Sequence, residues 1–89
     1  MNYKISYPTS LSEINIDNDN IDILVSCENG DEFTFVVATI ANLEHLLENG
    51  ILDPSIKPLI VDKLTQTNIE NILKLTMQDT KLYSFYGKD

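Results

Sequence analysis

The chain is short and strongly acidic: its 89 residues carry a formal net charge of -8, with 14 acidic side chains, six lysines and no arginine. This length fits one small domain, residues 1–89, with a limited core and modest stability. A hydrophobic fraction of 43% is typical of chains that fold. Because arginine is the usual bidentate ligand of phosphate, its absence disfavours direct nucleic-acid binding. No apolar run approaches the roughly 20 residues of a membrane helix, and the N-terminus lacks a signal-peptide core, so we expect a cytoplasmic protein.

The side chains that most often carry chemistry are sparse. Cys27 and His45 are the only residues of their kinds, so the sequence predicts neither a disulfide framework nor a metal cluster. Asp17, Asp19 and Asp22 resemble the start of a calcium loop, but the sixth position of such a loop requires glycine and here holds Asp22. No glycine-rich phosphate loop is present. We therefore expect a protein that is not an enzyme and has no cofactor or metal.

The first predicted element is a short strand. Residues 3–7 alternate, with Tyr3, Ile5 and Tyr7 on one side, and Pro8 ends the run because it has no N–H to offer a ladder. The polar stretch that follows ends in DNDN at 17–20, a turn sequence whose side chains bond their own backbone.

Residues 21–28 and 31–39 form a predicted β-hairpin on which the rest of the chain is built. A two-residue loop, Asn29-Gly30, would place the aliphatic residues of the first strand opposite Thr34, Val36 and Ala38. A three-residue loop, Glu28-Asn29-Gly30 with Gly30 left-handed, pairs Ile21, Ile23 and Val25 with Val37, Phe35 and Phe33 instead. We predict the three-residue loop, because it makes one face wholly apolar. The other face then carries a mixed set: Asp22, Leu24, Ser26, Glu32, Thr34 and Val36.

Two helices are predicted after the hairpin. The first spans about 40–49, with Thr39 as N-cap, leucines at helical spacing and Gly50 as the left-handed terminator. The run 59–61 predicts a short strand. The second helix spans about 66–78 and opens at Thr65 or at Thr67, the latter in a capping box with Glu70.

The closing run KLYSFYG is dense in β-favouring aromatic residues, which predicts a last short strand over 82–86. The tyrosines in it are either core residues or exposed interface anchors. Together these elements indicate an α+β fold, in which an antiparallel sheet built on the central hairpin has both helices packed on its apolar face.

The charge is unevenly distributed along the chain. Residues 1–32 carry seven acids against Lys4 alone, whereas residues 57–89 hold five lysines and four acids. An acidic N-terminal part suits a basic partner. An alternative meaning is that the acidity only keeps a small protein soluble and its sheet edges unpaired.

The run GDEFTFVVATIANLEHLLENG, followed by KPLIVDKLTQTNIENIL, resembles small immunity proteins of bacterial polymorphic toxin and contact-dependent growth inhibition systems. The resemblance covers roughly residues 30–73, with Ile40 standing where the family pattern often has proline. The matching positions are Gly30, Phe33, Phe35, Thr39, Leu43, Leu59, Ile60, Val61 and Ile69.

This resemblance implies a protein that binds a cognate toxin domain and blocks its active site or its substrate approach. Such toxins are often nucleases, whose clefts must be positive, so an acidic surface would dock there and exclude the nucleic acid. The first choices for contact residues are Asp17, Asp19, Asp22, Glu28, Asp31 and Glu32, and the second choices are Glu13, Glu44 and Glu48. The competing hypothesis is a small structural or regulatory interaction module without a toxin partner. The sequence leaves open which toxin is bound, whether its active site or an exosite is blocked, and the oligomeric state.

Overall fold

The computed structural model describes residues 2–47 and 50–88, which fold around a four-stranded sheet with strand order β1-β2-β3-β4. The elements in chain order are β1 (Tyr3–Ser6), the 3-10 turn η1 (Leu11–Glu13), β2 (Asn20–Cys27), β3 (Glu32–Thr39), α1 (Ile40–Leu46), β4 (Leu59–Val61), α2 (Gln66–Met77) and α3 (Thr80–Tyr86). Strands β1, β2 and β3 pair antiparallel, whereas β4 pairs parallel with β3. The predicted α+β fold on a central hairpin is thus confirmed, with a sheet that is mostly antiparallel. Within the described ranges, no helix has the length and apolarity that a membrane crossing requires.

The β2–β3 hairpin has the predicted three-residue loop and register. Ile23 pairs with Phe35, and Val25 pairs with Phe33. The loop is closed by two backbone bonds, from Cys27 N–H to the Asp31 carbonyl at 2.7 Å and from Gly30 N–H to the Cys27 carbonyl at 3.0 Å. Gly30 has φ +95°, a conformation that costs a residue with a Cβ about 1–2 kcal/mol. The turn residues therefore fix which side chains share a face of the sheet.

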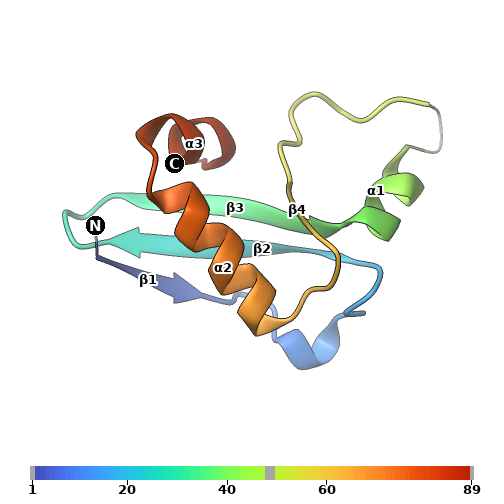
Figure 1. The fold of residues 1–89 in the computed structure, drawn as a ribbon, viewed down its shortest axis with the longest axis horizontal. Coiled ribbons are helices and arrows are strands. Elements are labelled where there is room, and N and C mark those ends of the chain that lie inside the picture. Colours follow the sequence, from blue (N-terminus) through green and yellow to red (C-terminus); the bar gives the residue numbers. More distant parts are fainter. Residues whose placement is uncertain (1, 48–49, 89) are drawn as a thin grey trace.

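The core lies between one face of the sheet, here called the inner face, and α2, which lies across it (Figure 1). Phe35 and Val37 of the hairpin meet Ile69 and Leu73 of α2, and all four side chains have no exposed surface. Phe33 is only half-buried and packs at the edge of this cluster. Of the two helix starts that the sequence allowed, the chain uses Thr65, whose Oγ1 accepts a hydrogen bond from Asn68 N–H at 3.2 Å.

The prediction of a last strand over 82–86 is wrong, because this segment is helix α3. Asp79 caps it by accepting from Lys81 N–H at 2.8 Å. The helix packs on α2 and β3, where the Tyr83 ring meets the Phe33 ring edge-on at 5.3 Å. After the helix, Lys88 makes a two-bond bridge to Thr34 on the edge of β3. Tertiary contacts thus override the β preference of the aromatic residues.

Helix α1 is shorter than predicted and does not lie over the inner face. It ends at Leu46 and has no fully buried residue, and it continues from the end of β3 at the margin of the sheet (Figure 1). Positions 48 and 49 of the predicted helix lie outside the described residues. The Thr39 N-cap is as predicted, since its Oγ1 accepts from Asn42 N–H at 3.1 Å. Of the two predicted helices, only α2 covers the core.

Candidate partner-binding surface

The sheet face opposite α2, here called the open face, has no helix over its centre among the described residues (Figure 1). Because side chains alternate along a strand, the register defines its members. They are Lys4 and Ser6 of β1, Asp22, Leu24 and Ser26 of β2, Glu32, Thr34, Val36 and Ala38 of β3, and Ile60 of β4. Leu24 and Val36 are half-buried and Ile60 is 50% exposed. This mixed apolar and polar composition is typical of a surface that can serve a partner.

The α1 end of the open face holds an apolar hollow of about 170 Å³. Its lining comes from β2, β3, α1 and the connection before β4: Asn20, Asp22, Val36, Ala38, Leu46, Ile56 and Pro58. The exposed Asp22 is the one charged residue of this lining. A long side chain with an apolar stem and a cationic head matches such a hollow.

Three of the predicted contact residues, Glu28, Asp31 and Glu32, lie together at the hairpin turn. All three are exposed. The turn is stiffened by Asn29, which accepts from Asp31 N–H at 3.0 Å and donates to the Asp31 carboxylate at 3.1 Å. Glu32 also belongs to the open face, opposite Ser26. The hairpin therefore presents three exposed carboxylates on a stiffened turn, and Glu32 continues this group onto the open face.

Asp17 and Asp19, in contrast, have structural partners at the other end of the sheet. Asp17 forms an ion pair with Lys63 at 3.1 Å. The Asp19 carboxylate accepts from the N–H groups of Asn15 and Asn20 at 3.1 and 2.9 Å. The Asp19 carbonyl also accepts from Thr39 N–H at 3.1 Å, which ties this loop to the start of α1. The Asp19 carboxylate therefore holds the loop in place, whereas Asp17, whose side chain is 70% exposed, forms only a surface ion pair.

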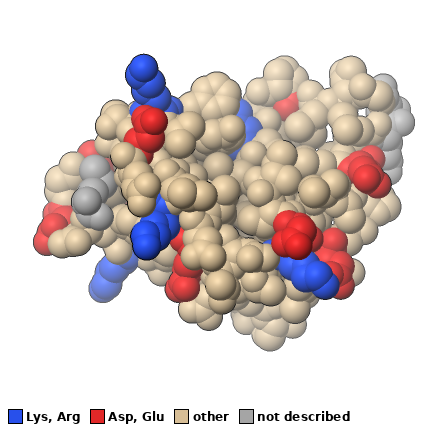
Figure 2. Space-filling view, viewed as in Figure 1, with Lys and Arg blue, Asp and Glu red and all other residues tan. Residues whose placement is uncertain are grey.

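The predicted contact residues do not form one patch. Strand β2 has eight residues between the two acidic ends, a span of about 23 Å at roughly 3.3 Å per residue. Asp22 lies between the ends, Glu13 is in η1, Glu44 is on α1, and position 48 lies outside the described residues. On the helical side, charged groups are scattered around the margin without an acidic cluster (Figure 2). Of the predicted set, Asp22, Glu28, Asp31 and Glu32 are the four on or beside the open face.

The strand pattern predicts the mixed face but not the hollow in it. Leu46, Ile56 and Pro58 reach the sheet through a helix and an irregular connection, and no periodic pattern links such segments. The order of strand, helix and strand over residues 32–61 was the available signal for this hollow. Two parallel strands need a crossover connection, and such a connection returns beside the sheet.

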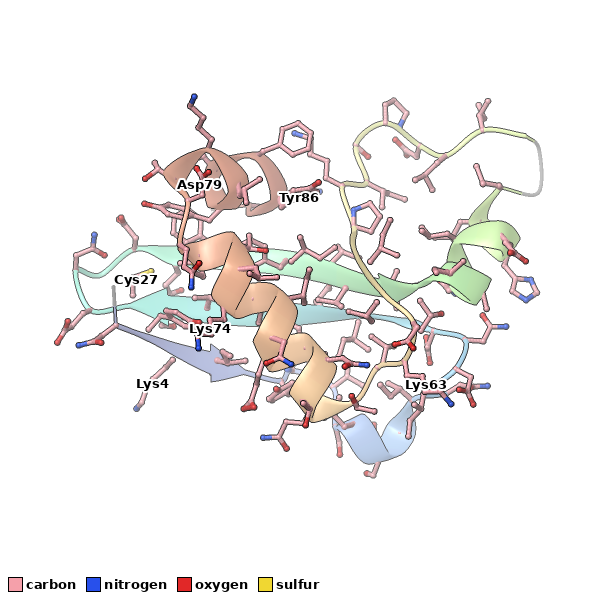
Figure 3. All side chains as sticks on the ribbon, in the orientation of Figure 1. Lys4, Cys27, Lys63, Lys74, Asp79 and Tyr86 are labelled. Carbon is pink, nitrogen blue, oxygen red and sulfur yellow. The ribbon has the colours of Figure 1, made fainter. Side chains whose placement is uncertain are left out.

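The two potentially reactive side chains, Cys27 and His45, lie far apart. Cys27 is buried at the hairpin end of β2 (Figure 3), and burial, followed by the nearby Asp31 carboxylate, raises the pKa of its thiol. His45 is exposed on α1, at the opposite end of the sheet. Among the described residues, no three His, Cys, Asp or Glu side chains are grouped so that they could hold a metal ion. Cys27 and His45 therefore do not form a nucleophile–base pair.

Comparison with protein-family models, with curated proteins and with solved structures found no match for this chain.

Proposed function

We propose that this protein is a non-catalytic inhibitor that binds a basic protein domain through its open face and the adjoining hairpin turn. In keeping with the resemblance of residues 30–73 to immunity proteins, the partner is the nuclease domain of a cognate bacterial toxin. The protein covers the positive cleft of that domain and so excludes nucleic acid from it.

The observation that carries this proposal is the open face itself. Half-buried Leu24 and Val36 lie at its centre and exposed Ile60 at its β4 side, an arrangement of apolar centre and polar rim that protein interfaces use. The carboxylates at the rim supply complementarity to a basic surface. With the longest dimension of the molecule at 40 Å, one interface of ordinary size, about 800 Å² per partner, takes in both the open face and the hairpin turn.

Electrostatics then contributes mainly to the rate of association. A net charge of -8 on a chain without arginine attracts a cationic domain over long range. The apolar centre, once desolvated, governs how slowly the complex dissociates.

The test is binding to the toxin domain encoded beside this gene, measured with two matched double variants. Asp22→Lys with Glu32→Lys alters the open face, and Glu13→Lys with Glu44→Lys makes the same change of charge on η1 and α1, outside the strands of that face. Each pair takes the formal charge from -8 to -4. At low salt we expect the first pair to slow association about 10-fold or more, and the second pair to slow it far less. High salt should remove most of this difference.

Protection of cells that express the toxin domain is the functional readout. No binding and no protection would leave an interaction module without a toxin partner and end the immunity proposal. Equal effects of the two double variants would show that net charge acts without the open face. A Val36→Glu change, which places a charge at the centre of that face, should abolish protection if the face is the interface.

A further inference from the structure

Strand β1 is an edge of the sheet, paired only with β2 within the described residues. Glu28 N–H donates to the Asn2 carbonyl at 3.1 Å, so the backbone of residue 2 faces β2. In an antiparallel ladder the backbone direction alternates. The N–H and C=O groups of Tyr3, Ile5 and Tyr7 therefore point away from β2, toward the open edge.

We propose that β1 pairs with β1 of a second copy of this chain, antiparallel about a two-fold axis at Ile5, to join two sheets into one of eight strands. In this register Ile5 lies opposite Ile5 of the second copy, and Tyr3 lies opposite its Tyr7. All three outward-facing residues find partners, so no edge N–H or C=O within the strand is left over. The pairing is isologous, as a closed dimer requires.

The side chains on both sides of the sheet tolerate this register. Tyr3, Ile5 and Tyr7 pack on the inner face beside the core, so the two copies place apolar residues next to apolar residues. On the open face Lys4 comes opposite Ser6 of the second copy, which avoids facing lysines. A hollow of about 330 Å³ lined by Tyr3, Lys74, Met77 and Gln78 lies at the Tyr3 end of this strand, where the Tyr7 end of the second copy comes.

The charges of α2 are also self-complementary about this axis. Lys74 lies over β1 beside Tyr3 (Figure 3). Glu70, one helical turn away, is close enough to Tyr7 to act with burial, the larger cause, in raising the pKa of its hydroxyl. Because the axis exchanges the Tyr3 and Tyr7 ends of the strand, Lys74 of each copy faces Glu70 of the other. Opposite charges meet twice, which favours a second copy over an unrelated strand.

Sedimentation equilibrium of the purified chain provides the first test. At 100 µM we expect a mass of twice 10.1 kDa. Both Lys74→Glu and Glu70→Lys should weaken the dimer about 10-fold or more, since each places like charges opposite one another. The double exchange should restore affinity to within about 3-fold of the original, and Lys81→Glu, an exposed lysine of α3, should leave it unchanged. A monomer at 1 mM, or a dimer insensitive to both single changes, overturns the proposal.

Disulfide trapping tests the register itself. A mixture of the Lys4→Cys and Ser6→Cys variants should form a covalent heterodimer on oxidation, because directly opposed strand residues have the Cα separation of a disulfide. Neither variant alone should cross-link as fast. Cys27 is buried and on the other face. Equal cross-linking of the Lys4→Cys variant with itself would show a different register and refute the axis at Ile5. This inference does not depend on the proposed function, because the dimer leaves both open faces free.

Discussion

The hydroxyl of Thr39 joins the start of α1 to the loop before β2, and the Thr39→Val variant tests this role. The side chain is fully buried. Its Oγ1 accepts from Asn42 N–H at 3.1 Å, as the N-cap of α1, and from Asp19 N–H at 3.3 Å, from the loop before β2. Valine keeps the volume of threonine and removes only the hydroxyl, so both donors lose their acceptor with little change in packing.

Thr65 provides a matched comparison within the same chain. It also caps a helix through its Oγ1, accepting from Asn68 N–H at 3.2 Å, but it is only partly buried, and among the described residues its hydroxyl bonds to no second segment. Loss of an N-cap costs about 1 kcal/mol. Leaving the Asp19 N–H without its partner costs about another 1 kcal/mol. We therefore expect Thr39→Val to lower the free energy of unfolding by about 2 kcal/mol and Thr65→Val by about 1 kcal/mol.

Urea unfolding, followed by circular dichroism at 222 nm, measures the free energy of unfolding of both variants, and thermal unfolding gives their melting temperatures. For a domain of this size, 1 kcal/mol corresponds to a shift in melting temperature of about 4–8 °C, so Thr39→Val should shift it roughly twice as far as Thr65→Val. The slope of free energy against urea should not change, because the same surface is exposed on unfolding. Equal costs for the two variants would refute the joining role of Thr39 and leave it as an ordinary cap.

Three further predictions concern the turn, the C-terminal helix and the edge strand. Gly30→Ala should lower the free energy of unfolding by about 1–2 kcal/mol in urea unfolding, because φ is +95° at this position; no loss would contradict the left-handed turn. Gly87→Ala should loosen α3 and speed amide exchange in residues 80–88, because a Cβ there would lie 2.6 Å from the Tyr83 carbonyl; unchanged exchange would refute this close approach. Burial, with a smaller effect of Glu70, raises the pKa of Tyr7, so the folded state keeps a proton that the unfolded chain loses, and stability should fall as pH rises above about 10. Tyr7→Phe should remove that part of the loss of stability at high pH. At pH 7 it should also raise the free energy of unfolding, measured in urea, by about 1 kcal/mol, because the Tyr7 hydroxyl is buried without a partner among the described residues. An unchanged loss at high pH, or a lower stability at pH 7, would contradict this.

The hairpin was predictable because two local signals agree on it. The alternation of Ile21, Ile23 and Val25 and the position of Gly30 both predict a hairpin, and only the three-residue loop gathers the apolar side chains of both strands on one face. Helix α2 was predictable for the same reason, since Ile69, Leu73 and Met77 recur at helical spacing and are buried.

The C-terminal segment was not predictable from intrinsic preference. Tyr83, Phe85 and Tyr86 favour strands, yet the cap at Asp79 and the contact of Tyr83 with Phe33 stabilise a helix. Leu82, Tyr83 and Tyr86 also have helical spacing. In a segment of only seven residues, however, such spacing does not distinguish a helix from a strand. Packing on α2 and on Phe33 of β3 then favours the helix.

Part of the candidate surface was likewise predictable from local sequence, and part depends on long-range contacts. Strand alternation together with the three-residue loop places Asp22, Leu24 and Val36 on one face, and the turn places Glu28 and Glu32 at one end. Composition, however, treats all acids alike, and it takes the folded chain to separate carboxylates that hold a loop from those that face solvent. Asp19 holds its loop through the N–H groups of Asn15 and Asn20, whereas Asp17 faces solvent in a surface ion pair with Lys63. An interface that depends on charge should therefore lose more from changes at Asp22 and Glu32, and changes at Asp19 should act first through stability. A variant that binds weakly and also melts at a lower temperature behaves as expected for Asp19, through lost stability. The melting temperature of each variant should therefore be measured together with its binding.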